Sequence, residues 1–596
     1  MPAYKAPLRD MRFLMNEVFD YPAHYAGMAN GKDADPDTVS AILDECAKFC
    51  EEVLSPLNLS GDEEGCHFAN GEVKTPKGFK EAYDQYVAGG WQGLSHPTEY
   101  GGQGLPMSMG LIKSEMMGAA NWSFTMYPGL SLGAMNTIMQ HAPEDLKNLY
   151  MPPLTEGRWT GTMCLTEPQC GTDLGQVKTR AEPQADGSYK ITGTKIFISA
   201  GEHDLAENIV HIVLARLPDA PAGTRGISLF IVPKMKVKAD GGLDGSNKVV
   251  CSAIEHKMGI RASATAVINF EESTGHLIAE PNKGLEAMFT FMNTARIGTA
   301  VQGIAHAELS YQGALAYAKE RRSMRALSGK KEPEQVADAI IHHADVRRML
   351  LESRALIEGG RAFLLWGALQ ADLQHVAEDE KGREKASDYM GLLTPVIKAY
   401  LTDKGLKVTS DAMQVHGGSG FTEHFPASQY MRDVRITLIY EGTNGVQALD
   451  LVGRKLPSKG GRALQTFLGE VDAYVAAEEG TTKVPAYIKA LKETKAKLMD
   501  GTMWLMQNGM GNPDNAAAGS LDYLHLFGLT CMSYMWAMMA KAAQDEIDNG
   551  STDPFFASKL KVGRVFLERI LPDADAHLAK MKGGAEALMA LEDELF

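Results

Sequence analysis

The chain has 596 residues, a formal net charge of −16, 44% hydrophobic residues and 22% charged residues. This length exceeds what one compact core accommodates and predicts about three to four domains. The composition is typical of a folded protein rather than a disordered one, and the acidic charge argues against nucleic-acid binding.

The seven cysteines are sparse, odd in number and contain no C-x-x-C pair. They therefore favour neither a disulfide framework nor a zinc site, and we expect no metal, a reducing compartment and a cytoplasmic location. Cys46 and Cys50 are four residues apart, a spacing that also suits a metal. Because both lie on the apolar stripe of an expected helix, core packing is favoured.

No secretory signal is expected, because the first ten residues contain neither a long apolar region nor a small-residue cleavage site. The most apolar stretch, 521–540, includes Asp522, His525, Thr530 and Ser533. These polar residues predict a buried helix and no membrane insertion.

The first part of the chain, residues 1–157, is expected to be a helical domain. From 37 to 54, apolar residues recur at alternating intervals of three and four residues, until Pro56 ends the pattern. Further helical patterns cover 77–87, 107–119 and 134–140, with a glycine-rich turn at 100–104.

A β domain is expected over 158–283, where short β-rich runs are separated by turn-forming residues. The runs cover 189–199, 209–217, 226–233 and 266–270. Helical periodicity resumes at Gly284 and predicts a helical bundle over 284–455. After a linker-like segment at 455–461, residues 456–596 are expected to form an additional all-helical domain, with the methionine-rich run at 532–539 in its core.

The common nicotinamide, P-loop and zincin motifs are absent from the sequence. Five other short segments occur in a fixed order: CLTEPQCGTD at 164–173, KIFIS at 195–199, KMGIRASAT at 257–265, QVHGGSGF at 414–421 and IYEGTN at 439–444. Together they resemble the acyl-CoA dehydrogenase family over most of residues 80–455. The resemblance implies a helical, β, helical fold, FAD as cofactor and 2,3-dehydrogenation of an acyl-CoA thioester.

Glu441 matches the family's catalytic base, which removes the α-proton while the β-hydride passes to flavin N5. In the family, the thioester oxygen is held by the base's backbone N–H and by a ribityl hydroxyl of the flavin. An apolar setting beside Ile439 and Tyr440 is expected to raise the carboxyl pKa from about 4.3 toward about 6 to 7. The alternative is a carboxylate at a helix N-terminus with only a structural role.

The resemblance also assigns residues to the cofactor. Thr166 and Thr172 resemble contacts with the flavin ring and pyrophosphate, and Phe197 and Ser199 resemble the aromatic and hydroxyl groups beside the ring. The alternative for these strand residues is a core position for Phe197 and a solvated one for Ser199. Thr443 resembles a further FAD contact.

Arg321 resembles an arginine that reaches the FAD pyrophosphate of a neighbouring subunit, which implies at least a homodimer. Gln414, Gly417 and Gly418 resemble a glycine-rich stretch that approaches the same group. A solvated charge run is the alternative for Arg321. Asn293 and Arg296 are assigned to the substrate thioester, with a structural ion pair as the alternative for Arg296.

The opening residues 1–35, an extension seen in part of the family, and the additional C-terminal domain resemble the branch that includes 3-methylmercaptopropionyl-CoA dehydrogenases. An electron-transfer flavoprotein is the expected electron acceptor, in fatty-acid β-oxidation or methylthiopropionyl-CoA catabolism. Two alternatives remain: an acyl-CoA oxidase that uses oxygen, and a diverged flavin-bearing binding protein. Acyl length, a dimer or a larger assembly, and the role of residues 456–596 are left open.

Overall fold

The computed structural model describes residues 4–376 and 379–596, as two compact units. One unit comprises residues 45–298, and the other combines the N-terminal residues up to 44 with residues 299–596. The predicted class is confirmed, since a central β region lies between helical regions and a further helical region follows. The bounds of the four domains predicted above stay predictions.

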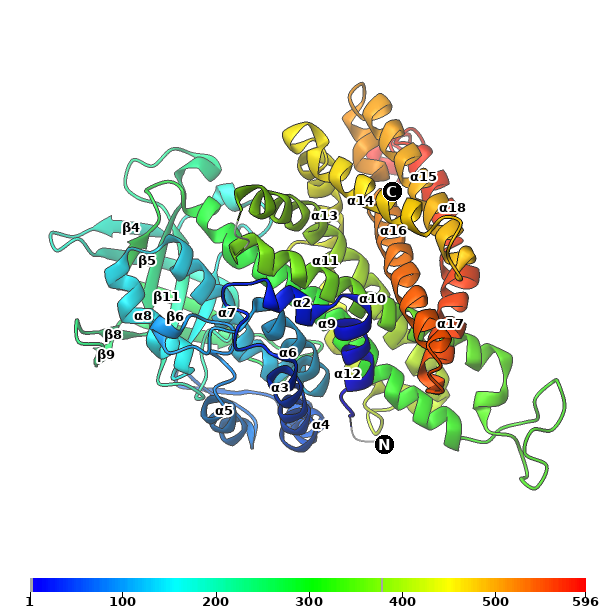
Figure 1. The fold of residues 1–596 in the computed structure, drawn as a ribbon. Helices are drawn as coiled ribbons and strands as arrows, with labels where there is room; N and C mark the ends of the chain where they lie inside the picture. The colour runs from blue at the N-terminus through cyan, green and yellow to red at the C-terminus, as the bar shows by residue number, and fades with distance from the viewer. Residues whose placement is uncertain (1–3, 377–378) are drawn as a thin grey trace. The chain divides into compact units, whose positions relative to one another are not determined.

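The unit of residues 45–298 begins with helices and continues into strands (Figure 1). Its helices are α4 (Pro56–Glu64), α5 (Phe79–Ala88), α6 (Met107–Ala120), α7 (Trp122–His141) and α8 (Glu144–Glu156), with a hairpin of β1 (His67–Ala69) and β2 (Glu72–Lys74). Cys50, which lies in the π-helical turn Cys50–Leu54, is fully buried, as is Cys46 in α3 (Pro36–Phe49). The prediction that both cysteines belong to the core is confirmed.

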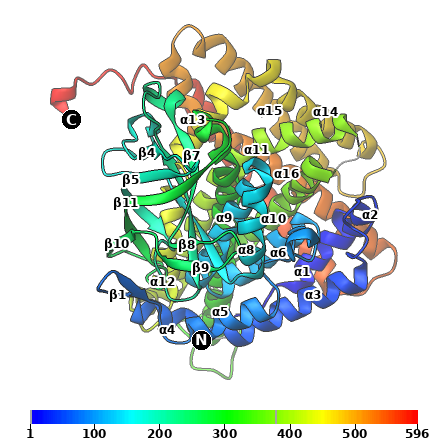
Figure 2. The same cartoon turned by 90° about the vertical axis from the view of Figure 1, so that its left-hand side faces the viewer.

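Seven strands form the main sheet, in the order β3-β6-β7-β11-β5-β4 with β10 added to β11. They are β3 (Trp159–Cys164), β4 (Arg180–Pro183), β5 (Tyr189–Ser199), β6 (Asn208–Ala215), β7 (Ser228–Pro233), β10 (Val249–Ile254) and β11 (Thr265–Ile278), and β8 (Met235–Val237) pairs separately with β9 (Leu243–Ser246). Figure 2 shows β5 and β11 side by side. All eight residues of β6 are buried, so this strand forms the centre of the β core.

The sheet closes on itself at one end. The N–H of Ala181 donates to the carbonyl of Arg216, and the N–H of Arg216 donates to Thr179, each over 2.8 Å. Arg216 also donates its guanidinium N–H groups to carbonyls of the neighbouring turns, including Val177 at 2.6 Å. This closure satisfies strand-edge groups that would otherwise be unpaired.

The other unit is helical, and its elements extend from both ends of the chain. They are α1 (Leu8–Arg12), the π-helical turn Phe13–Val18, α2 (Tyr21–Ala26), most of α3, most of α9 (Gly284–Glu320), α10 (Ala344–Val376), α11 (Glu380–His416), α12 (Ala427–Arg435) and α13 (Asn444–Asp450), followed by α14 (Arg462–Glu478), α15 (Pro485–Gly509), α16 (Pro513–Asp548), α17 (Pro554–Val565) and α18 (Asp573–Lys582). α10 packs on α11, and α16 packs on both and on α13.

The apolar stretch 521–540 lies within α16, and its side chains from Tyr523 to Ala537 are buried. This confirms the prediction of a buried helix and places the methionine-rich run in the core. None of the helices in the described part of the chain has the length and hydropathy that a bilayer crossing requires.

Candidate active site

Glu441 lies in a tight turn between the 3-10 turn Ile436–Leu438 and α13. Its φ of +59° is in the left-handed region, which a side chain other than glycine rarely adopts. Gly442 follows with a φ of +82°, and a Cβ there would come within 2.5 Å of the amide nitrogen of Gln447. The turn therefore needs glycine after the glutamate and is strained at the glutamate itself.

Buried polar side chains hold this turn. Gln447 donates to the carbonyl of Glu441 over 3.0 Å, and the ammonium of Lys398 donates to the carbonyl of Gly442 over 2.8 Å. Gln447 and Lys398 are both fully buried. The strained conformation is thus fixed by hydrogen bonds from α13 and α11, a role that the sequence motifs did not reveal.

The residues around Glu441 are partly exposed in this structure. Glu441 is half-buried, and Ile439 is 49% exposed. Tyr440 is anchored by a hydrogen bond from its hydroxyl to Gln302 of α9. Thr443 caps α13 by accepting from the N–H of Val446 over 3.2 Å, and its own hydroxyl proton is available to a ligand.

Phe197 and Ser199 lie near the end of β5, beside Thr166. The N–H of Ile196 donates to the carbonyl of Thr166 over 2.9 Å. The β5–β11 register shifts between Lys195 and Ile198, and Phe197 has a φ of +59° and is 59% exposed. The bulge directs the Phe197 ring outward, so the alternative that places this residue in the core is wrong.

A buried ion pair shapes the segment that contains Thr166. The Lys195 ammonium donates to Glu167 over 2.9 Å, and the hydroxyl and N–H of Thr179 donate to the same carboxylate over 2.6 and 3.0 Å. Burial opposes ionisation, but Lys195 and these donors together lower the pKa of Glu167 to about 2. The carboxylate is therefore ionised and determines the shape of the turn. Thr172 is exposed in the same loop, after Gly171.

This pair predicts a specific loss of stability in acid. The folded pKa of Glu167, about 2, lies below an ordinary value of about 4.3, so its contribution is complete above the ordinary value and is lost as pH falls toward 2. Glu167→Gln should lower the stability of the β region at pH 7 by about 3 kcal/mol. Chemical unfolding at pH 7, 5 and 3 measures this, with the exposed strand residue Glu182→Gln as control. If the stability of wild type and that of Glu167→Gln fall by the same amount as pH is lowered, the prediction is wrong.

Arg321 follows the last residue of α9 and is exposed. One turn earlier, the ring of Tyr317 lies 4.7 Å from that of His416, and its hydroxyl contacts Ser419 over 3.4 Å. The structure therefore brings the end of α9 together with the end of α11, which carries Gln414, and with the following turn, which carries Gly417 and Gly418. Gln414, Gly417 and Gly418 are all exposed.

Arg296 and Asn293 lie on the part of α9 that belongs to the unit of residues 45–298. Arg296 is 6% exposed and donates to the side chain of Asn293 over 3.3 Å. Its guanidinium also lies 5.8 Å from the ring centroid of Phe289. Asn293 is exposed.

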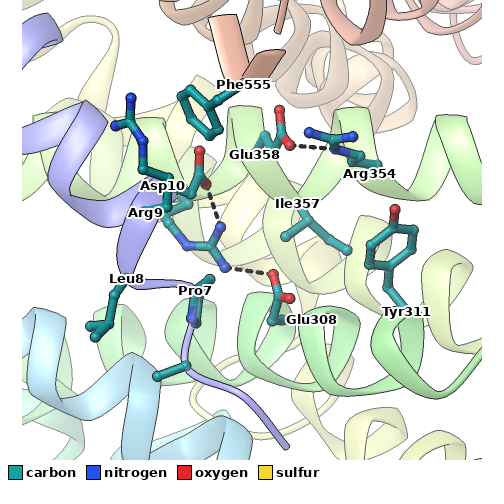
Figure 3. Close-up of a pocket in the computed structure, with 12 residues that line it drawn as sticks. Pro7, Leu8, Arg9, Asp10, Glu308, Tyr311, Arg354, Ile357, Glu358 and Phe555 are labelled. Carbon is teal, nitrogen blue, oxygen red and sulfur yellow. Dashed lines mark hydrogen bonds and ion pairs between the residues drawn. The ribbon is translucent and has the colours of Figure 1, made fainter. Parts of the chain in front are cut away.

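A separate cavity of about 260 Å³ lies among α1, α9, α10 and α17 (Figure 3). Asp10, Glu308, Tyr311, Arg354 and Glu358 are among its lining residues. None of the residues predicted from the sequence for the flavin or the thioester lines this cavity. Arg354 pairs with Glu358, and Arg361 pairs with Asp10 and Glu308. We assign these charged side chains a structural role.

Family models match almost the whole chain. Those for the N-terminal, middle and C-terminal domains of acyl-CoA dehydrogenases match residues 36–158, 162–273 and 282–456. The chain belongs to the acyl-CoA dehydrogenase family. A model described as "Acetyl-CoA dehydrogenase C-terminal like" matches residues 467–592, so the additional helical region is also a family feature. The chain is accordingly an oxidoreductase.

Individual acyl-CoA dehydrogenases are similar over the full length. 3-Methylmercaptopropionyl-CoA dehydrogenase of Ruegeria pomeroyi is 41% identical, covering 98% of this chain and 99% of the relative. Butyryl-CoA dehydrogenase of Syntrophomonas wolfei is 33% identical, covering 100% and 99%. The structure of an acyl-CoA dehydrogenase complexed with FAD from Bacillus anthracis shares the fold, with a TM-score of 0.74, 20% identity and coverage of 99% of this chain and 93% of that one.

The chain's own geometry fits FAD, the cofactor of acyl-CoA dehydrogenases. A Cβ added at Gly417 or Gly418 would meet no atom within 4 Å, so the backbone there is open to a pyrophosphate. The exposed ring of Phe197 offers an apolar surface to an isoalloxazine ring. Both observations agree with the contacts that the family resemblance implies.

Proposed function

We propose that this acyl-CoA dehydrogenase catalyses FAD-dependent 2,3-dehydrogenation of an acyl-CoA thioester to the trans-2-enoyl-CoA, with Glu441 as the base. The observation that carries this proposal is the strained turn at Glu441, held by Lys398 and Gln447. A costly backbone conformation that buried groups hold in place is typical of catalytic residues.

In the proposed reaction, Glu441 takes the α-proton of the thioester. Its own backbone N–H holds the thioester oxygen on which negative charge develops. Bound FAD supplies a hydride acceptor for the β-carbon. Arg296 and Asn293 orient the thioester, and Phe197 with Ser199 and Thr166 contact the ring.

We further propose that electrons leave to an electron-transfer flavoprotein. Support for a substrate class comes from two relatives, whose names include 3-methylmercaptopropionyl-CoA and butyryl-CoA. We therefore favour short acyl chains, in methylthiopropionyl-CoA catabolism or fatty-acid β-oxidation.

The test is an anaerobic titration of the purified, flavin-loaded protein with methylthiopropionyl-, C4-, C8- and C16-CoA, with the flavin absorbance as the readout. Bleaching by the short thioesters supports the proposal and ranks the substrates. If none of the thioesters bleaches the flavin, the proposal is overturned. Rapid reoxidation by oxygen with hydrogen peroxide release would instead assign the protein to the oxidases.

We propose a homodimer in which Arg321 reaches the FAD of the neighbouring subunit. The loop that follows Arg321 carries Met324, Leu327 and Val336, all among the most exposed apolar side chains of the described chain. Such side chains favour cover by another protein surface, and a second copy is the occupant that the family resemblance implies.

Arg321→Ala should therefore weaken flavin retention and dimerisation together, because one guanidinium serves both. Flavin content after dialysis and the sedimentation profile measure the two effects. Arg564→Ala, which removes an exposed arginine from α17, is the control. If Arg321→Ala matches this control in both assays, Arg321 is only a solvated charge.

A further inference from the structure

The additional C-terminal helical region reaches the turn of the catalytic base through buried hydrogen bonds. Asn444, the first residue of α13, is 6% exposed and follows Glu441 by three positions. Its side-chain oxygen accepts from the ammonium of Lys398 over 2.8 Å, and Lys398 also holds the carbonyl of Gly442. The position of Lys398 therefore depends on the orientation of the Asn444 amide.

Asp403 helps to fix that orientation, together with the carbonyl of Ala399 and the hydroxyl of Thr402, which accept from the same amide nitrogen over 3.3 and 3.0 Å. One carboxylate oxygen accepts from the Asn444 amide nitrogen over 2.8 Å. The other accepts from Nε2 of His525 over 2.9 Å. His525 belongs to α16, in the region beyond residue 456. The carboxylate of Asp403 is thus shared between the bundle that carries the base and the C-terminal region.

The ring of His525 is buried and packs against a second histidine. It is 9% exposed, and the ring of His577 in α18 stacks on it with centroids 4.9 Å apart and planes 10° apart. Nδ1 of His577 is in turn bonded to Asp522 over 2.7 Å. Because the Asp403 carboxylate can only accept, Nε2 of His525 carries the proton.

Burial is the main reason why the His525 ring is neutral. Burial lowers the pKa of His525 below its ordinary value, while the bond with Asp403 raises it, and Lys404 and His577 lower it further. The neutral ring donates one hydrogen bond through Nε2. A side-chain amide can supply the same single bond, which provides a conservative replacement.

We propose that His525 is a positioning residue for catalysis, through which the C-terminal helical region holds the Glu441–Gly442 turn by way of Asp403, Asn444 and Lys398. The inference rests on the proposed role of Glu441 as the base. Without His525, one oxygen of Asp403 loses its donor and the carboxylate can turn. The Asn444 amide then keeps only Ala399 and Thr402 as firm acceptors, and Lys398 holds the carbonyl of Gly442 less firmly. The strained turn then relaxes in part, and the carboxylate of Glu441 moves away from the α-carbon of the bound thioester.

The expected signature is a lower kcat with an almost unchanged KM. Misplacement of a catalytic group by about 1 Å reduces rates by up to about a hundredfold, so a partial relaxation in His525→Leu should lower kcat by about three- to thirtyfold. Because proton abstraction becomes slower, the kinetic isotope effect with an α-deuterated thioester should rise. His525→Gln, which can donate to Asp403, should restore most of the rate.

His577→Leu is the matched control, since His577 stacks on His525 but does not contact Asp403. It should leave kcat and the isotope effect close to those of the wild type. Asp403→Asn, which keeps the side-chain shape, should reproduce the His525→Leu signature and serves if that variant folds poorly. Flavin content and the unfolding temperature are measured for every variant.

The inference is overturned if His525→Leu keeps kcat within twofold of wild type with an unchanged isotope effect. A loss that His525→Gln does not restore, or that His577→Leu shares, also overturns it by assigning the effect to packing. Failure of the proposed function is distinguishable, because the wild-type flavin would then not be bleached by any thioester.

Discussion

Glu441→Gln should keep yellow, bound FAD and thioester binding but lose turnover by at least about a hundredfold, the usual scale for removing acid–base catalysis. The amide has nearly the same shape and cannot accept the α-proton. The hydrogen bond from Gln447 to the backbone carbonyl of residue 441 does not involve the side chain, so the turn should persist. Steady-state kinetics and anaerobic bleaching rates measure the loss.

The control is Glu423→Gln, which replaces an exposed carboxylate of the same unit, 3.9 Å from Arg432. This control should keep turnover within about twofold of the wild-type value, because a surface ion pair is weak. If Glu441→Gln retains turnover comparable to that of this control, another residue is the base. Lost flavin in Glu441→Gln would instead indicate a damaged fold.

Arg361→Met should destabilise the helical unit by about 3–5 kcal/mol, the range for removing one partner of a buried ion pair. Arg361 is 1% exposed and donates to Asp10 over 2.5 Å and to Glu308 over 2.7 Å. Lys559, itself fully buried, pairs with Asp10 and with Glu358. Despite burial, Lys559 and Arg361 lower the pKa of Asp10, so the variant would leave a buried negative charge without its arginine.

Urea unfolding followed by circular dichroism measures this effect, with the exposed pair variant Arg564→Ala as control. That control should leave the unfolding midpoint almost unchanged, because an exposed ion pair contributes little. In the double variant Asp10→Asn with Arg361→Met, part of the lost stability should return, because the buried charge is removed with its partner. Equal midpoints for Arg361→Met and the control would show that the network contributes little.

Much of the fold could be predicted from the sequence, because the spacing of apolar residues along the chain indicates where helices and strands lie. The rhythm at 37–54 predicted a helix, and α3 with its π-helical turn covers nearly these residues. The strand predicted at 189–199 has the same bounds in the structure. The strand predicted at 209–217 ends earlier, at Ala215, because the chain turns beyond it to close the sheet through Arg216.

The groups that hold the candidate site could not be predicted in this way. Lys195 and Glu167 are 28 positions apart, and Lys398 and Gly442 are 44 apart. No periodicity or local motif connects such pairs, since they meet only after strands and helices pack. Glu441 was identified by resemblance, whereas its left-handed backbone conformation became visible only in the structure.

The ion pair between Asp10 and Lys559 joins residues 549 positions apart. During synthesis at about 5–20 residues per second, Asp10 emerges roughly 30–110 seconds before its lysine. During that interval, Asp10 of α1 and Glu358 of α10 lack the lysine that pairs with both of them. The helical unit can therefore complete its core only after the last helices have left the ribosome, and a nascent chain stalled before α17 should remain a substrate for chaperones.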